Sequence, residues 1–376
     1  MQKQISVWQF VLLLYICRIF STMTYAPAMG VGSGGVSVLI SWVLSLGIGI
    51  LVLLPALWLH SMSGDKNVVM LSLSVWRRLG VGIALCYFVY TMMTAVSTFA
   101  HFEFFMTNAI FPQSSTLFFI ITMWIAAVYA SSVGLEAIAR TGAVVFAAFL
   151  VSFGFIVFAS LGQVDLVELK LPLDNIWKEV GASAYEAFSR SAEFVVVLLL
   201  LPHIKGNLKK GVLAFLCMLV VTSEIIAFLI LTVLGDYSAT QTLPYYTLSS
   251  AAEFSIFQRL DALHMTVWVA IALVKIALYL FLSVECLQML FPEKHKKAVS
   301  VGCCLLLFVL VLPFCYSRTA FYGLFRAFSS GIPSILLVIV FPLLIGAAMK
   351  IKKGRAEHET TKHTSVGAAS AADLRN

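Results

Sequence analysis

The sequence predicts an all-α integral membrane protein with ten transmembrane helices. Of its 376 residues, 61% are hydrophobic and only 11% are charged, and the mean hydropathy is +0.97. One water-soluble core could not bury that much apolar surface. Apolar runs of about 20 residues, the length that spans a bilayer, recur along the chain. A few ionisable residues lie inside these runs, which is typical of proteins with an internal polar site.

The transmembrane helices are expected in ten apolar ranges, each close to the length of a bilayer span. Together these ranges form one membrane domain, residues 1–350. Residues 351–376 lack the apolar residues of a core, so they are expected to form a disordered cytoplasmic tail. The ten ranges are 6–27, 36–59, 79–100, 116–132, 141–161, 181–202, 211–235, 263–290, 299–316 and 331–349.

The basic residues predict the orientation. Most of the 25 lysines and arginines fall in alternate connecting segments, and positive charge favours the cytoplasmic side. Both termini are therefore expected in the cytoplasm. The net charge of +7 comes in short clusters without a basic stripe interleaved with aromatic residues, so no nucleic-acid partner is expected.

Motifs of catalysis and of metal binding are missing from the sequence. It has no GxSxG, HExxH or Walker pattern, and its seven cysteines show no ligand spacing. We therefore expect no enzymatic activity, no cofactor and no metal.

Five ionisable residues lie near the middle of predicted helices. A bare charge there costs several kcal/mol, about 2.5–3.5 on insertion scales, so the five are expected to converge on one polar chamber at the membrane midplane. They are Arg18 in the first helix, Arg190 and Glu193 in the sixth, Glu224 in the seventh and Lys275 in the eighth.

The first and sixth helices are expected to be interrupted. Arg18 is followed by Ser21 and Thr22, and Glu193 is preceded by Ser189 and Ser191. Hydroxyl side chains can pair with backbone groups that a broken helix leaves free. Interruptions at corresponding positions of two five-helix halves are typical of a transporter binding site.

The roles of these residues remain open between function and structure. Arg18 could pair with Glu193, with Glu224 or with the carboxylate of a substrate. Lys275 could be a structural ammonium in place of a bound cation or a group that exchanges protons, and the hydroxyl and tyrosine side chains could simply pack. The candidate ligand-binding residues are Arg18, Phe20, Ser21, Thr22, Tyr90, Thr94, Ser189, Arg190, Ser191 and Glu193, and the candidate ion-coupling or structural charges are Glu224 and Lys275.

Three stretches resemble the B subunits of endospore germinant receptors, the GerAB-like proteins of the amino acid-polyamine-organocation (APC) transporter superfamily. The resemblance covers about residues 5–350 and includes Pro27 at the end of the first helix. The stretches are EFSIFQRLDALHMTVWVAIALVKIALYLF at 253–281, GLEAIAR at 134–140 and AFSRSAEFVVVLLLLPHIK at 187–205.

This resemblance implies two inverted five-helix repeats, the LeuT/APC-like arrangement. It also implies a subunit that senses a nutrient germinant, usually an amino acid, together with A- and C-type subunits in the inner membrane of spores. A working amino acid permease, proton-coupled or exchanging, is the alternative. A purely structural scaffold for the partner subunits is the third possibility.

Overall fold

The computed structural model is all-helical apart from one short strand pair. It describes residues 4–25, 35–63, 66–169, 176–189, 192–252, 261–317, 319–320, 322–323, 327 and 331–352. The principal helices are α1 (Val7–Tyr25), α2 (Gly35–Ser63), α3 (Val68–Val75), α4 (Arg77–Phe105), α5 (Thr116–Val133), α6 (Leu135–Ser160), α7 (Ile176–Ser189), α8 (Glu193–Leu200), α9 (Leu208–Leu229), α10 (Pro244–Ala251), α11 (Asp261–Gln288), α12 (Lys296–Tyr316) and α14 (Ile332–Ile335).

Nine helices in the described part of the chain are long and apolar enough to cross a membrane. The last of them joins α14, the π-helical turn η8 (Leu336–Val340) and the residues that follow into one helix, Ile332–Lys352. The sixth predicted range falls short because it is divided between α7 and α8. Their 14 and eight residues are about 21 and 12 Å long, less than a bilayer needs.

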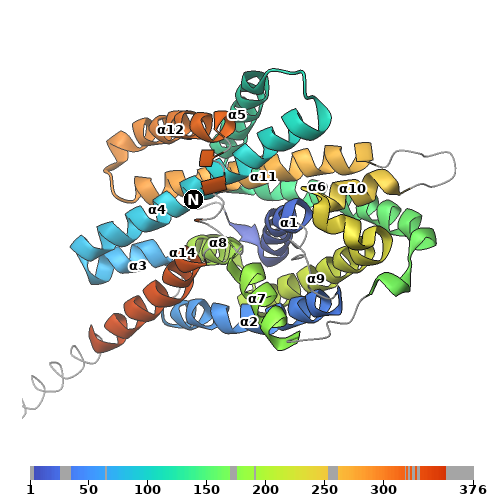
Figure 1. Cartoon of the computed structure of the whole chain (residues 1–376). Helices are drawn as coiled ribbons and strands as arrows, with labels where there is room; N and C mark the ends of the chain where they lie inside the picture. Colours follow the sequence, from blue (N-terminus) through green and yellow to red (C-terminus); the bar gives the residue numbers. More distant parts are fainter. Residues whose placement is uncertain are drawn as a thin grey trace, which may run out of the picture.

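The centre of the molecule is α1, which packs against α6, α8, α9 and α11 (Figure 1). This position explains why α1 is so deeply buried. Of its most apolar 18-residue stretch 78% lies inside the protein, whereas the value for the span that contains the peripheral α12 is 17%. Lipid can cover the outer helices, whereas every face of α1 needs a protein partner. A charge on α1 therefore has protein neighbours on all sides.

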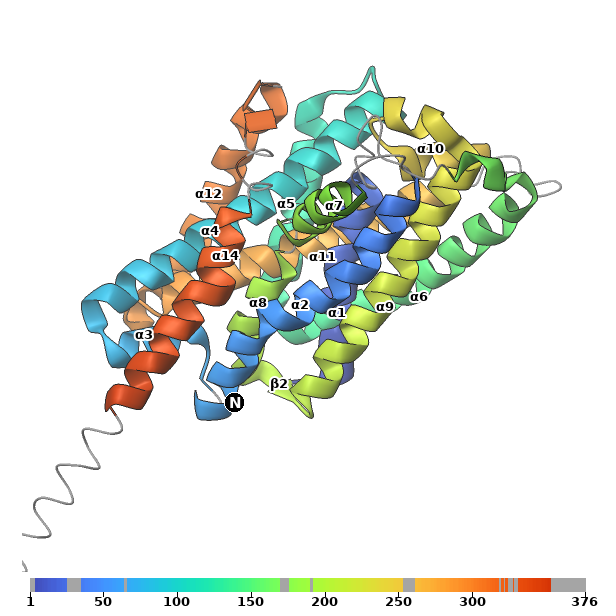
Figure 2. The same cartoon turned by 60° about the horizontal axis from the view of Figure 1, so that its bottom comes forward.

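One end of the molecule is fixed by a parallel pairing of β1 (Ile5–Ser6) with β2 (Ile204–Lys205). It brings the start of α1 beside the connection from α8 to α9, near the N-terminus marked in Figure 2. Gly206 has a φ of +126°, in the left-handed region that glycine tolerates, and this lets the chain turn from β2 into α9. We call this the β1–β2 end.

Candidate functional site

The ammonium of Lys275 lies where α1, α8 and α11 meet. Its Nζ donates to the Cys17 carbonyl at 2.8 Å, to Ser21 Oγ at 3.0 Å and to Glu193 Oε1 at 2.8 Å. A lysine ammonium has three donors, and all three are used. Lys275 is only 3% exposed and Glu193 is fully buried, so this is an ion pair held inside the protein.

The α1 helix supplies two of these acceptors without a break. Cys17 and Ser21 are four residues apart, so the Cys17 carbonyl and the Ser21 hydroxyl lie on one face, a turn apart. The predicted interruption of the first helix is wrong for residues 7–25, which form one continuous helix. The ammonium finds its acceptors on an intact helix, and the Thr24 hydroxyl donates back to the Phe20 carbonyl within it.

Glu193 is placed by the division of the sixth predicted range. The helix α7 ends at Ser189, Ala192 lies in a turn, and Glu193 is the first residue of α8. A carboxylate at a helix N-terminus is favoured by the helix dipole. Its Oε1 accepts from Lys275, and its Oε2 has no hydrogen-bond partner among the described residues. One buried acceptor, Glu193 Oε2, thus has no described partner at the N-terminus of α8.

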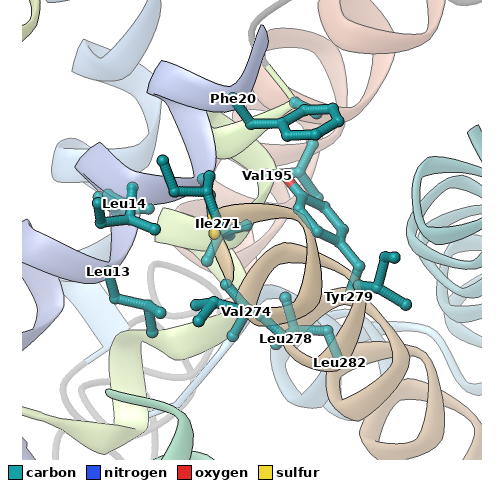
Figure 3. Close-up of a cluster of buried hydrophobic side chains, with 14 of the residues drawn as sticks. Leu13, Leu14, Phe20, Val195, Ile271, Val274, Leu278, Tyr279 and Leu282 are labelled. Atoms are coloured by element: carbon teal, nitrogen blue, oxygen red, sulfur yellow. The ribbon is translucent and has the colours of Figure 1, made fainter. Parts of the chain in front are cut away.

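Aromatic rings cover the ammonium. Lys275 Nζ lies 5.3 Å from the centre of the Phe20 ring and 5.9 Å from that of Tyr279. Figure 3 shows Phe20, Val195 and Tyr279 reaching into the same apolar cluster from α1, α8 and α11. Phe20 also stacks on Trp268, with ring centres 5.0 Å apart. The pair is therefore enclosed by apolar and aromatic side chains, in which an unpaired charge would be costly.

Arg18 on α1 and the candidate residues Tyr90 and Thr94 on α4 approach the Lys275–Glu193 ion pair, which we call the centre. Arg18 is 4% exposed and lies close enough to Tyr90 and Tyr279 to interact with them electrostatically. The hydroxyls of Tyr90 and Ser334 are 3.2 Å apart, and the Thr94 hydroxyl donates to the Tyr90 carbonyl. Tyr90 thus joins the centre to the last helix, while the described hydrogen bond of Thr94 stays within α4.

The remaining candidates are placed less fully. Thr22 is buried, and its hydroxyl has no hydrogen-bond partner among the described residues. Ser189 ends α7, but its side chain lies outside the described part, as do Arg190 and Ser191 altogether.

Glu224 does not join the centre through any described contact. Its carboxylate lies on α9 near Val43 of α2, the helix packed against α9, and its Oε1 has no hydrogen-bond partner among the described residues. Of the five charges expected to share one chamber, Arg18, Glu193 and Lys275 lie together among the described residues, Glu224 shares no described contact with them, and Arg190 lies outside the described residues.

Sequence reasoning missed the Cys17 carbonyl, Tyr279 and Trp268. A backbone acceptor leaves no trace in residue identity. Tyr279 could have been found, because it lies one turn after Lys275 on α11 and therefore on the same face. Trp268 is buried and donates from Nε1 to Thr24 Oγ1 at 3.0 Å, which ties α11 to α1 beside the ion pair.

Three solved structures have a similar fold. A Na⁺-coupled sialic acid symporter matches with 11% identity and a TM-score of 0.60, covering 92% of this chain and 89% of its own. MhsT in complex with L-phenylalanine matches with 12% identity and 0.57, over 93% and 89%. Mhp1, a nucleobase-cation-symport-1 family transporter, matches with 13% identity and 0.58, over 89% and 78%. These similarities show that the chain has a LeuT-like fold.

The family model described as "Spore germination protein" matches residues 4–320. The chain belongs to this family of spore germination proteins. No curated protein matches the chain.

Proposed function

We propose that the protein is the B subunit of a germinant receptor, which binds a small nutrient at the middle of the membrane and signals spore germination. The observation that carries the proposal is the buried contact of Lys275 with Glu193, with Arg18 close by. Buried charges in a membrane protein of this fold are typical of binding sites and coupling sites. Membership of the spore germination family supports the link to germination.

An amino acid is the ligand class that fits these groups best. Its ammonium would take the free Glu193 Oε2, and its carboxylate would take Arg18 and backbone donors between α7 and α8. The complex of MhsT with L-phenylalanine supports the choice, because that relative binds an amino acid on the same fold. The proposed contact residues are Arg18, Phe20, Ser21, Thr22, Tyr90, Thr94, Ser189, Arg190, Ser191 and Glu193.

Lys275 would act as a built-in cation between α11 and α1. A permanent ammonium there would keep Glu193 ionised and α1 attached without a bound metal ion. A role in proton exchange is the alternative for Lys275. Glu224, at its separate place between α9 and α2, would be a structural charge or a second proton carrier.

The signal would be a change of conformation passed to partner subunits of the A and C types. Binding would shift an open/closed equilibrium in proportion to the difference in affinity between the two states. The arrangement we infer is ten membrane helices in two inverted five-helix repeats, spanning residues 1–350, with a cytoplasmic tail at 351–376. Both termini would face the cytoplasm, and the membrane would be the inner membrane of the spore.

An amino acid permease is the second candidate, and the symporters among the structural relatives favour it. Uptake of radiolabelled amino acids into liposomes that contain the purified protein separates the two functions. Uptake above that of empty liposomes supports the permease, whereas loss of germination in a deletion strain without measurable uptake supports the receptor.

The test of the receptor is the germinant dose response of spores that carry Glu193→Gln or Arg18→Gln. We expect the half-maximal germinant concentration to rise about tenfold or more, because each substitution removes one charge-assisted contact. Glu224→Gln is the matched control, a membrane carboxylate outside the centre, and should change the concentration little. Unchanged dose responses with normal subunit levels would overturn the binding role, and loss of the partner subunits would instead indicate a scaffold.

A further inference from the structure

A second charged contact joins the far end of α8 to α11. His203 lies in the short 3-10 turn η4 (Leu201–His203) that follows α8, and its Nε2 is 2.8 Å from Glu285 Oε1. A carboxylate only accepts, so the imidazole is the donor. The His203 and Glu285 side chains are 11% and 19% exposed, so water reaches this pair more readily than it reaches Lys275 and Glu193.

The Glu193–Lys275 and His203–Glu285 contacts are separated by the same number of residues on both elements. The acid and the base come in opposite order on the two elements. His203 lies ten residues after Glu193, and Glu285 lies ten residues after Lys275. At about 1.5 Å per helical residue the contacts are roughly 15 Å apart along both elements. The acid precedes the base on the α8 segment, and the base precedes the acid on α11. If one segment ran in the opposite direction, Glu193 would face Glu285 and His203 would face Lys275, and like charges would meet. The two pairs therefore fix the alignment of α8 with α11.

The His203 pair is also connected to α1. Ile204 and Lys205, the next two residues, form β2 and pair with Ile5 and Ser6 at the start of α1. Lys275 joins the same three elements at the other end of α8. The short α8 segment is therefore attached to both α1 and α11 at each end.

We propose that His203 and Glu285 form a proton-dependent positioning contact that holds α8 in register with α11 and so keeps Glu193 on Lys275. A protonated imidazole adds Coulomb attraction to the hydrogen bond, because an opposite charge close to the carboxylate favours the charged form of histidine. The attached state therefore binds the proton more tightly than the detached state. Its added stability is fully present below the ordinary histidine pKa, about 6.5, and is lost as the pH rises through the higher pKa of the attached state.

Other ionisable groups lie on the elements around this pair. Lys205 is exposed on β2, Cys286 is buried next to Glu285, and Lys296 is bound to Glu293 at the start of α12. The remaining charges on the described ends of neighbouring elements are Lys294 and His295 between α11 and α12, Lys297 on α12, His60 on α2, Lys66 before α3, Arg77 and Arg78 on α4, Arg140 with Glu136 on α6, Lys209 and Lys210 on α9, and Lys350 and Lys352 at the end of the last helix.

The test is amide hydrogen exchange of residues 193–205 in the purified full-length protein in nanodiscs without ligand, at about pH 6 and about pH 8. After correction for the pH dependence of chemical exchange, we expect about fivefold slower exchange at the lower pH in the wild type. His203→Gln and Glu285→Gln keep a polar side chain but remove the titrating charge pair, so both should lose the difference. Glu224→Gln should keep it.

A charge-swapped protein with His203→Glu and Glu285→His provides the rescue. It restores a titrating pair at the same place, so the pH difference should return, which a merely structural packing role would not produce. Wild-type exchange that does not depend on pH, or a pH difference that survives in both glutamine variants, would overturn the proposal. Because no germinant is present, either result is independent of the proposed receptor function.

Discussion

Ser21 and Thr22 are adjacent hydroxyl residues with different surroundings. Ser21 Oγ accepts from the buried Lys275, whereas Thr22 Oγ1 has no hydrogen-bond partner among the described residues. Removing an acceptor from a buried ammonium leaves one donor unpaired, at a cost of about 1–3 kcal/mol. We therefore expect Ser21→Ala to lower the thermal unfolding midpoint in detergent more than Thr22→Ala does. Equal effects of the two substitutions would contradict the assigned hydrogen bond.

At the same scale, residue identity predicted which charges lie inside the membrane helices but not which of them meet. Lys275, Glu193 and Arg18 were found because a charge inside an apolar run is conspicuous. Glu224 looked equivalent in the sequence, yet it lies on α9 at the side of the helix that faces α2. Its helix face is fixed by packing between α9 and α2, and apolar residues all around both helices leave no periodic signal for that face.

At the scale of elements, α1 and α9 approach closely at Gly211. A Cβ added there would lie 2.5 Å from Val7 Cγ2, whereas one added at Gly82 on α4 would meet nothing within 4 Å. Gly211→Ala should therefore destabilise the protein by about 1–3 kcal/mol through overpacking. Gly82→Ala should leave stability unchanged or raise it by up to about 1 kcal/mol, because alanine favours helices.

Thermal unfolding of the two alanine variants in the same detergent checks this pair. A Gly211→Ala protein as stable as the wild type would mean that α1 can shift away from α9 at no cost. The close approach of the two helices would then not be a fixed feature of the fold.

Helix interruptions were predicted in two places, and the described residues differ between them. The Ser-Thr pair near Arg18 remains within a continuous α1, whereas the sixth range is divided between α7 and α8. Small hydroxyl residues permit a break but do not force one. The short helix α3 was not predicted. Its eight residues are far fewer than a membrane span needs, and its N-cap residue Asn67 is a weak signal alone.

At the scale of the whole molecule, the β1–β2 pairing and the His203 contact bring the start of α1, the start of α9 and the end of α11 to one end. The opposite end holds the turn at Asp165, whose backbone N–H donates to the Thr232 carbonyl. We therefore expect a cysteine at Lys209 or Lys294 to face the cytoplasm, and one at Asp236 to face outward.

Labelling with a membrane-impermeant maleimide in protoplasts measures this arrangement. Lys209→Cys and Lys294→Cys should react only after permeabilisation, and Asp236→Cys should react in intact protoplasts. The reverse pattern would invert the orientation. Opposite behaviour of Lys209→Cys and Lys294→Cys would contradict the position of α11 relative to α9.

The whole arrangement depends on the buried bond between Lys275 and Glu193, and a double-mutant cycle measures it most directly. Removing one partner leaves an uncompensated buried charge, so Lys275→Met and Glu193→Gln should each cost about 3–5 kcal/mol of unfolding free energy. The unfolding free energy lost in the double variant should be smaller by about 1–3 kcal/mol than the sum of the two single losses, because neither charge is left buried without its partner. Strictly additive costs would show that the two side chains do not meet and that α8 is held against α11 by other means.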